Sequence, residues 1–257
     1  MNRNYKRVIV QKVRKIAIVR MLLDNLPRKC VFKNQMSYKV PRSVWRLWRL
    51  WRKYGASEIE VVYNEYKGGD FIDVGAFHGF YSLLLGPKAS PGSTFVSLEP
   101  DRNALPSLLS NLAVAAKLFP YVRFMVLPIA AGDGSAMDVS YPGGTDGHPA
   151  YNSYAADGSG SQDTRDVSTT IDYLISALRL HPSFVKIDVE GAEYAVLKGM
   201  GSSMRTYRQS IMLEVHPDWQ PAGVNLDMIE GLLKEYSYRH RIIQHEVMCD
   251  RLLVSPE

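Results

Sequence analysis

From residue 70 onward, short apolar runs alternate with longer amphipathic runs, which indicates strands followed by helices. The apolar runs predict strands at 70–74, 94–98, 122–127, 184–189, 210–215, 240–245 and 248–254. The amphipathic runs predict helices at 79–85, 104–118, 170–180, 191–200 and 225–236. Because alternating strands and helices form parallel sheets covered on both faces, the pattern predicts an α/β fold with a doubly wound, mostly parallel, seven-stranded sheet. No helix separates the last two strands, which therefore predict a hairpin with one antiparallel strand.

Two segments depart from this alternation. Residues 1–67 are basic and carry helical patterns, of which 44–53, VWRLWRLWRK, repeats Trp and Arg every three positions. We expect a basic helical extension over 1–67 and a catalytic-type domain over 68–257. Residues 141–165 are rich in Gly, Ser and Tyr and nearly devoid of aliphatic residues. They predict a long flexible loop of the kind that forms lids or binding loops.

Charge is distributed unevenly between the two predicted parts. Residues 1–53 hold 16 of the 31 Lys and Arg but one of the 26 acids, Asp24, so the remainder holds 15 bases and 25 acids. A segment of this charge suits an anionic surface such as a phospholipid membrane, an acidic glycan or nucleic acid. The alternative is a solvated cap that docks on the acidic body, with the tryptophans packed against it and the arginine stems covering its edge.

Cysteine content and hydropathy exclude several classes of protein. Cys30 and Cys249 lie far apart without ligand spacing, which argues against a disulfide framework or a zinc site. No run of 18 apolar residues is present, and basic residues interrupt the apolar N-terminal segment. We therefore expect a cytoplasmic protein without a spanning helix or signal peptide, with peripheral contact to an anionic membrane through 1–53 as one role of that segment.

The segment DFIDVGAFHGFYS at 70–82 carries the most specific chemistry. A strand ends in Asp73, a turn with Gly75 and Gly79 follows, and a helix begins. Such a turn lets a ligand approach the backbone N–H groups at the helix start. Phe77 stands where a dinucleotide fold has its second glycine, so a pyrophosphate fits poorly. A smaller cation such as S-adenosylmethionine fits better and is stabilised by Asp73.

Acidic residues also follow the other predicted strands. In a parallel sheet the carboxyl ends share one edge, where ligands bind. Glu99 is suited to grip the two ribose hydroxyls of an adenosine, and Asp133 can accept a hydrogen bond from an adenine amino group. The remaining residues at strand ends are Asp188, Glu190, Glu193, Glu214 and His216. An acidic edge suits a cationic cofactor.

These segments together resemble the FkbM-type S-adenosylmethionine-dependent methyltransferases over residues 68–217. The resemblance rests on FIDVGAFHGFYSLLL, SLEPDRNALPSLLSNL, TIDYL, FVKIDVEGAEYAVLKGM and IMLEVHP, of which DVEGAE is the most specific. It implies the class I methyltransferase (Rossmann-like) sheet and methyl transfer to oxygen on a sugar, glycan, lipid-linked or secondary-metabolite acceptor. Residues implied to line the methionine part are Asp73, Gly75, Ala76, Phe77 and Gly79. Glu99 is implied at the ribose, and Ala131 and Asp133 at the adenine. The family usually has Asn where this chain has Phe77.

Methyl transfer to an alcohol needs a group that takes the hydroxyl proton. His216 is the first candidate because an imidazole titrates near neutrality, although it also fits a histidine that simply caps a strand end. Asp188 is the second candidate, and Glu190 and Glu214 are expected to orient the base or bind hydroxyls. Asp188, Glu214 and His216 could also ligate a divalent metal, but the sequence fixes no geometry and we predict none.

Two other functions remain open from the sequence. The basic segment with interleaved tryptophans could hold phosphates and stack bases, as in an RNA methyltransferase. A methyltransferase fold can also act as a non-catalytic scaffold, although the intact cofactor acids and glycines argue against it.

Overall fold

The computed structural model describes residues 28–31, 37–40, 49, 56–135, 168–246 and 249–257. It divides the chain into two compact units, Met1–Tyr54 and Gly55–Glu257. The expected loop at 141–165 and the repeated tryptophans of 44–53 lie outside the described residues. We expected the domain boundary at residue 67, which is later than this division. The second unit therefore includes a helix at Ala56–Glu65 that we had assigned to the extension.

The described strands of the first unit form a short hairpin. β1 (Arg28–Val31) pairs with β2 (Ser37–Val40) in antiparallel register. We expected helical structure here and did not predict the hairpin. The two strands have the sequences RKCV and SYKV, and a proline stands next to each of them in the sequence, at positions 27 and 41.

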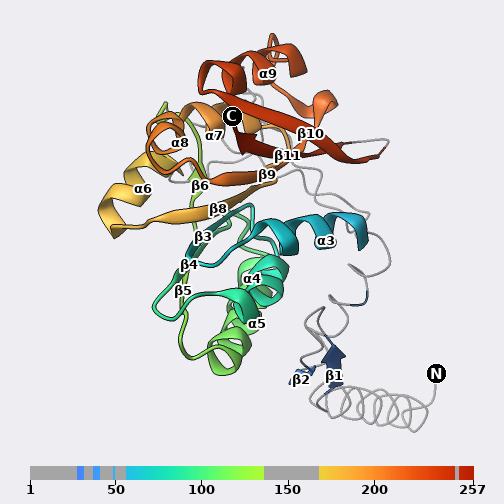
Figure 1. Cartoon of the computed structure of the whole chain (residues 1–257), viewed down its shortest axis with the longest axis vertical. Coiled ribbons are helices and arrows are strands. Elements are labelled where there is room, and N and C mark those ends of the chain that lie inside the picture. Colours follow the sequence, from blue (N-terminus) through green and yellow to red (C-terminus); the bar gives the residue numbers. More distant parts are fainter. Residues whose placement is uncertain (1–27, 32–36, 41–48, 50–55, 136–167, 247–248) are drawn as a thin grey trace, which may run out of the picture. The chain divides into compact units, whose positions relative to one another are not determined.

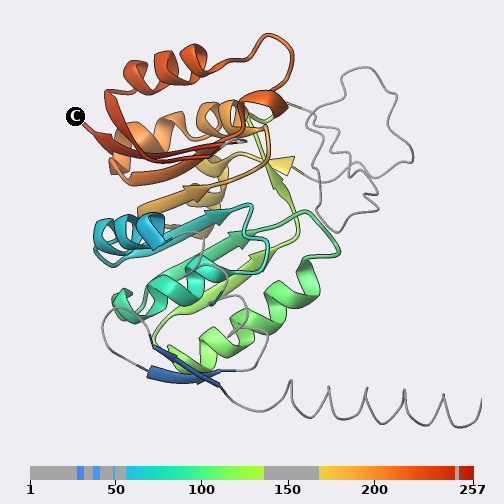
Figure 2. The same cartoon turned by 90° about the vertical axis from the view of Figure 1, so that its right-hand side faces the viewer.

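The second unit is an α/β domain around one large sheet (Figures 1 and 2). Its strands are β3 (Asp70–Val74), β4 (Thr94–Leu98), β5 (Arg123–Leu127), β8 (Pro182–Ile187), β9 (Ser210–Val215), β10 (Tyr238–His245) and β11 (Asp250–Pro256), with a small pair β6 (Ala130–Ala131) and β7 (Ser168–Thr169) beside it. Its helices are α3 (Ala56–Glu65), α4 (Phe80–Leu85), α5 (Leu105–Leu118), α6 (Ile171–Leu178), α7 (Glu193–Lys198), α8 (Gly201–Tyr207) and α9 (Leu226–Glu235), with single turns η1 (Gly86–Lys88) and η2 (Pro217–Trp219).

The strand order of the sheet is β10-β11-β9-β8-β3-β4-β5. All neighbours are parallel except β11, which is antiparallel to both β9 and β10. The seven-stranded, doubly wound sheet and its terminal antiparallel hairpin are therefore confirmed. The chain runs outward from β3 to β5 and then returns to β8 on the other side of β3. The strand order thus reverses between β3 and β8, where open α/β sheets bind their ligands.

Alternation along the strands explains how helices cover both faces. Ile72 and Val74 of β3 belong to one core cluster with residues of α6, α7, α8 and α9. Phe71 faces the opposite side, where it meets Tyr66, Phe95 and Phe184 in edge-on and tilted ring contacts. Figure 1 shows α3, α4 and α5 on one side of the sheet and α6, α7 and α8 on the other. Both faces of the sheet are apolar because helices cover them. The polar residues of the site therefore lie at the carboxyl ends of the strands.

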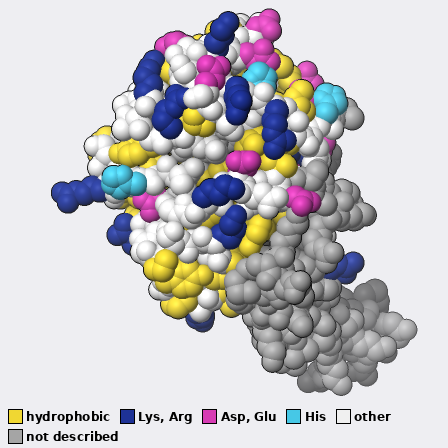
Figure 3. Space-filling model, viewed as in Figure 1, with side chains coloured by type: hydrophobic (Ala, Val, Ile, Leu, Met, Phe, Trp, Pro, Cys, Tyr) yellow, Lys and Arg dark blue, Asp and Glu magenta, His cyan; other side chains and the backbone are white. Residues whose placement is uncertain are grey.

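Among the described residues, no helix has the length and apolar character needed to cross a membrane. On the face drawn in Figure 3, basic and acidic side chains of the second unit are interspersed.

Candidate active site at the carboxyl ends of four neighbouring strands

The turn after β3 is held tightly against the strand beside it. Gly75 has a φ of 74°, and a Cβ atom there would lie 1.8 Å from the carbonyl oxygen of Asp188. Its N–H and that of Ala76 both donate to the carbonyl of Leu98 at 3.0 Å. Only glycine permits this approach, because any side chain would collide with backbone. The turn therefore joins the ends of β3, β4 and β8 at the point where the strand order reverses.

A buried lysine, which the sequence analysis missed, connects the ends of β3 and β8. Lys186 is 3% exposed, and its Nζ lies 3.2 Å from Asp188 Oδ2, 3.7 Å from Asp73 Oδ1 and 2.6 Å from the Gly75 carbonyl. Burial lowers the pKa of Lys186, but Asp188 and Asp73 outweigh burial and hold it above its usual value. The available sequence signal was a lysine inside the apolar run FVKI.

Asp73 and Glu99 have the acceptor capacity that the expected cofactor needs. Neither oxygen of Asp73 accepts a hydrogen bond, and burial raises its pKa to about 6 despite the opposing charge of Lys186. Glu99 accepts one bond on each oxygen, from the N–H of Phe77 at 2.6 Å and of Asp101 at 2.9 Å. A carboxylate has about four acceptor positions. Glu99 thus retains one on each oxygen, which fits the two hydroxyls of a ribose.

Phe77 and Gly79 complete this turn. Phe77 has a φ of 47° and is 42% exposed, although it is large and apolar. Left-handed backbone at a bulky residue is strained and usually marks a constrained site. Gly79 also has a positive φ, and a Cβ there would approach Leu108 of α5 at 2.8 Å. The turn is therefore shaped by close packing on both sides.

The expected adenine residues lie in and after β6. Ala131 is buried, whereas Asp133 is bound by Lys198 at 2.9 Å and by the N–H and hydroxyl of Ser135. The hydrogen bonds from Lys198 and Ser135 lower the pKa of Asp133 to about 2. Oδ1 thus accepts two bonds and Oδ2 one, so only Oδ2 keeps an acceptor position for a base.

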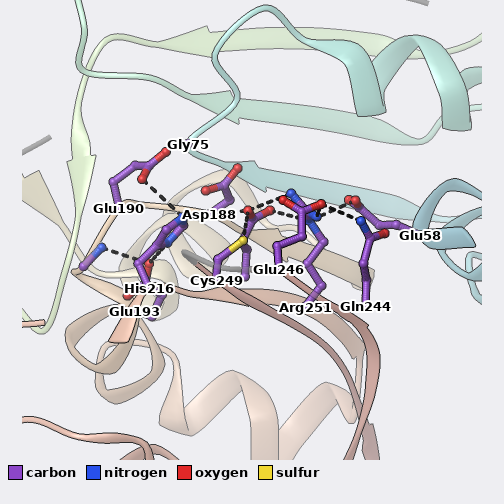
Figure 4. A network of polar contacts seen from close by, with 12 residues as sticks. Glu58, Gly75, Asp188, Glu190, Glu193, His216, Gln244, Glu246, Cys249 and Arg251 are labelled. Carbon is purple, nitrogen blue, oxygen red and sulfur yellow. Dashed lines mark hydrogen bonds and ion pairs between the residues drawn. The ribbon is translucent and has the colours of Figure 1, made fainter. Parts of the chain in front are cut away.

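The four expected catalytic residues come together at the ends of β8 and β9, and Lys186 links Asp188 to Asp73. Asp188 and Glu190 follow β8, and Glu214 and His216 lie at the end of the neighbouring strand β9. His216 Nε2 is 3.2 Å from Glu190 Oε2 and 3.7 Å from Glu214 Oε1, and its Nδ1 is 3.1 Å from Glu193 Oε1. Trp219 of η2 stacks on the imidazole at 4.8 Å between ring centroids. Figure 4 shows Glu190, His216 and Glu193 at one end of this polar network.

The surroundings of His216 correct one expectation from the sequence. Burial lowers the pKa of this imidazole, but its bond to Glu193 and the charges of Glu190, Glu193 and Asp188 outweigh burial and raise it to about 9. The predicted titration near neutrality is therefore wrong, because several carboxylates surround the ring. Burial and the charge of Asp188 raise the pKa of Glu190 to about 8.

The network continues through residues that the sequence gave no reason to connect. Arg251 of β11 binds Glu214 at 2.9 Å and Glu58 of α3 at 3.0 Å, and the thiol of Cys249 donates to Glu214 at 2.9 Å. Glu58 is fully buried, and burial raises its pKa to about 8 against the charge of Arg251. Glu214 thus accepts from Arg251 and Cys249 while its Oε1 lies 3.7 Å from His216 Nε2.

Comparison with known proteins supports the architecture. The family model described as "Methyltransferase FkbM domain" matches residues 73–240. A methyltransferase FkbM from Methylobacillus flagellatus KT has a similar structure, with a TM-score of 0.51 and 19% identity over 95% of this chain and 60% of that one. This chain thus spans less than two thirds of that protein.

More distant structures share the fold less closely. A precorrin-6y C5,15-methyltransferase from Geobacter metallireducens aligns with a TM-score of 0.42 and 13% identity, over 77% of this chain and 86% of that one. TrmK of M. capricolum, in complex with S-adenosyl-homocysteine, aligns with a TM-score of 0.42 and 8% identity, over 77% of this chain and 67% of that one. No curated protein sequence matches this chain.

Proposed function

Because this chain belongs to the FkbM family of S-adenosylmethionine-dependent methyltransferases, we propose that it transfers a methyl group to a hydroxyl oxygen of a sugar, glycan, lipid-linked or secondary-metabolite acceptor. The observation that carries the proposal is the joining of two sets of groups at one sheet edge. Asp73 and Glu99 end β3 and β4, and the His216 cluster ends β8 and β9, which are their neighbours in the sheet.

The cofactor half of the site is the turn after β3. Asp73, Gly75, Ala76, Phe77 and Gly79 would surround the methionine part, Glu99 would accept from the ribose hydroxyls, and Ala131 and Asp133 would flank the adenine. When bound, the cofactor supplies an electrophilic methyl group on a positively charged sulfur. The carboxylate of Asp73, whose oxygens accept no hydrogen bond, favours such a cation, and the fixed turn holds it in one orientation.

The acceptor half is defined by which carboxylates solvent can reach. The side chains of Asp188 and Glu190 are 24% and 26% exposed, whereas His216 is 5% exposed and Glu193 is fully buried. An acceptor hydroxyl can therefore meet Asp188 or Glu190 directly, and one of these takes its proton. His216 contacts Glu190 through Nε2 at 3.2 Å and acts as a positioning residue for the Glu190 carboxylate. This assigns the proton acceptor to a carboxylate, with His216 in support.

Methyl transfer to oxygen can be tested by following a labelled methyl group. The protein would be incubated with methyl-labelled cofactor and pools of glycans, lipid-linked saccharides and RNA, and the product would be examined by NMR for an O–CH3 signal. Asp188→Asn should lower kcat by about 10²–10⁴-fold if Asp188 takes the proton, with cofactor affinity retained. Methyl transfer to a base nitrogen or carbon of RNA, with none to oxygen, would overturn the assignment.

The basic segment 1–53 gives a reason to test contact with an anionic surface. Its charge favours phospholipid, in keeping with a lipid-linked acceptor at a membrane. The whole chain should sediment with anionic vesicles and should be released by salt, whereas a chain lacking 1–53 should remain in solution. Equal sedimentation of the two chains would remove this proposal without affecting the methyl-transfer assignment.

A further inference from the structure

Three side chains beside the cofactor turn form a set that suits a metal ion. One carboxylate oxygen from each of Asp188 and Glu190 and one imidazole nitrogen of His216 all lie within 4.8 Å of one another. They come from the ends of two adjacent parallel strands, β8 and β9, so the sheet itself fixes their spacing. Two carboxylates with one imidazole are a mixed hard and borderline set of ligands.

The imidazole is oriented in the way that metal-binding histidines usually are. Its Nδ1 bonds Glu193, which is fully buried, and Trp219 stacks parallel to the ring at an interplanar angle of 1°. A metal-ligating histidine commonly donates its second ring N–H to a carboxylate, which fixes the tautomer and the ring plane. Nε2 is thereby directed to the carboxylates in front of it.

The two carboxylates each keep an oxygen available to a cation. Asp188 uses Oδ2 for Lys186, while its Oδ1 is buried without a hydrogen bond. Glu190 Oε2 is also buried without a hydrogen bond and lies 3.2 Å from His216 Nε2. Two ligand atoms at right angles around an ion with bonds of about 2.2 Å are about 3.1 Å apart. The 3.2 Å between Glu190 Oε2 and His216 Nε2 thus matches the distance between two adjacent ligand atoms of one ion.

The backbone at Glu190 is strained in a way that sets this geometry. Glu190 has a φ of 55°, and the next residue, Gly191, has a φ of 108°. A non-glycine residue in the left-handed region is strained and persists where the surroundings enforce it. With this backbone conformation, Glu190 Oε2 lies 3.2 Å from His216 Nε2.

A second nearby set is a poorer candidate. Glu214, His216 and Cys249 also lie within 4.8 Å of one another. However, Glu214 accepts from Arg251 through both oxygens and from Cys249, so its lone pairs are engaged. A guanidinium at this distance would also repel a cation. Among the described residues the first set is contacted by one cation, Lys186, which lies 3.2 Å from Asp188 Oδ2 and leaves Asp188 Oδ1 without a hydrogen bond.

We propose that Asp188, Glu190 and His216 bind one divalent cation of the first transition row, with Mn²⁺ as the matching probe. Three protein ligands leave further coordination positions open on the side of Asp188 and Glu190 that solvent reaches. An acceptor hydroxyl would occupy one of them, where the cation would lower its pKa and the Glu190 oxygen that does not bind the ion would take its proton. This role rests on the proposed function, whereas binding of the ion does not.

The test is Mn²⁺ binding to the full chain, followed by electron paramagnetic resonance and calorimetry without cofactor. Wild-type protein should bind one Mn²⁺ per chain. Glu190→Gln and His216→Asn should each weaken binding by at least about 10-fold, and Glu193→Gln by about 10–100-fold because it orients the imidazole. Circular dichroism would show that each variant is folded.

A matched control is available on the surface of the same domain. Glu230 and His240 form a carboxylate–imidazole pair at 3.3 Å. Among the described residues, no third ligand lies close enough to complete a metal site with them. Glu230→Gln should leave Mn²⁺ affinity unchanged. No saturable binding up to about 1 mM Mn²⁺, or equal affinity in wild type and Glu190→Gln, would show that His216 and Glu190 form a simple ion pair. Cofactor binding, measured separately, distinguishes this failure from failure of the proposed function.

Discussion

The close approach of Gly75 to the end of β8 gives a prediction that isolates one feature of the cofactor turn. In Gly75→Ala the new Cβ would lie 1.8 Å from the Asp188 carbonyl oxygen, whereas ordinary contact begins at 3.4 Å. The left-handed backbone costs alanine about 1–2 kcal/mol. Displacing packed backbone by more than an ångström adds about 1–3 kcal/mol. We therefore expect a loss of about 2–5 kcal/mol.

Gly92→Ala is the matched control for this substitution. Gly92 has a φ of 87°, and a Cβ there would meet nothing within 4 Å. The control therefore carries the left-handed cost alone, about 1–2 kcal/mol. Each kcal/mol lowers the Tm of a domain of this size by about 2–4 °C. Gly75→Ala should thus melt well below Gly92→Ala.

The same pair of variants should separate in cofactor binding. Any shift of the Gly75 turn moves Asp73 and the carbonyl that Lys186 holds at 2.6 Å. S-adenosylmethionine affinity should fall at least about 10-fold in Gly75→Ala and stay unchanged in Gly92→Ala, by calorimetry. Equal melting temperatures for the two variants, or full affinity in Gly75→Ala, would show that β3 and β8 do not meet this closely.

Two further predictions concern charged pairs in the described part of the chain. The folded-state pKa of Asp133 is depressed, so its pairing stabilises the protein above about pH 4 and is lost as pH falls toward 2. Because Lys198 is 45% exposed, we expect Asp133→Asn to cost only about 1 kcal/mol at neutral pH, and to match wild type in acid denaturation near pH 2; an equal difference at both pH values would contradict this. Arg251→Met should cost about 3–5 kcal/mol in urea unfolding, because it leaves Glu58 and Glu214 buried without a cation, and adding Glu58→Gln should recover part of the loss. No recovery in the double variant would contradict the proposed charge compensation.

The strands of the large sheet could be predicted because most of them are short apolar runs, although β10 is mostly polar, and the short strands β1, β2, β6 and β7 were not predicted. The meeting of Asp73, Glu99 and Asp188 at one edge could be predicted as well, since parallel strands end on the same side. This prediction needs only the order of strands and helices along the chain, which can be read from a single sequence.

The partners of these residues could not be predicted, because they depend on which distant elements pack together. Glu58 reaches the site through α3, and Arg251 through the antiparallel β11, and neither has a local pattern that indicates a role. The titration of His216 was wrong for the same reason, since Glu190 and Glu193 approach it from the segment after β8. Lys186 is the exception, because a lysine within a buried strand is itself a signal.

The most direct test of the account is calorimetric titration of S-adenosylmethionine into the wild-type chain and Glu99→Gln, with NAD as a control ligand. Glu99 would bind the ribose through charge-assisted hydrogen bonds, which contribute about 1.5–3 kcal/mol. We predict one S-adenosylmethionine per chain, no NAD binding, and an affinity about 10–100-fold lower in Glu99→Gln. Absence of binding to the wild type, or equal affinity in Glu99→Gln, would contradict the assignment of the cofactor site to the ends of β3 and β4.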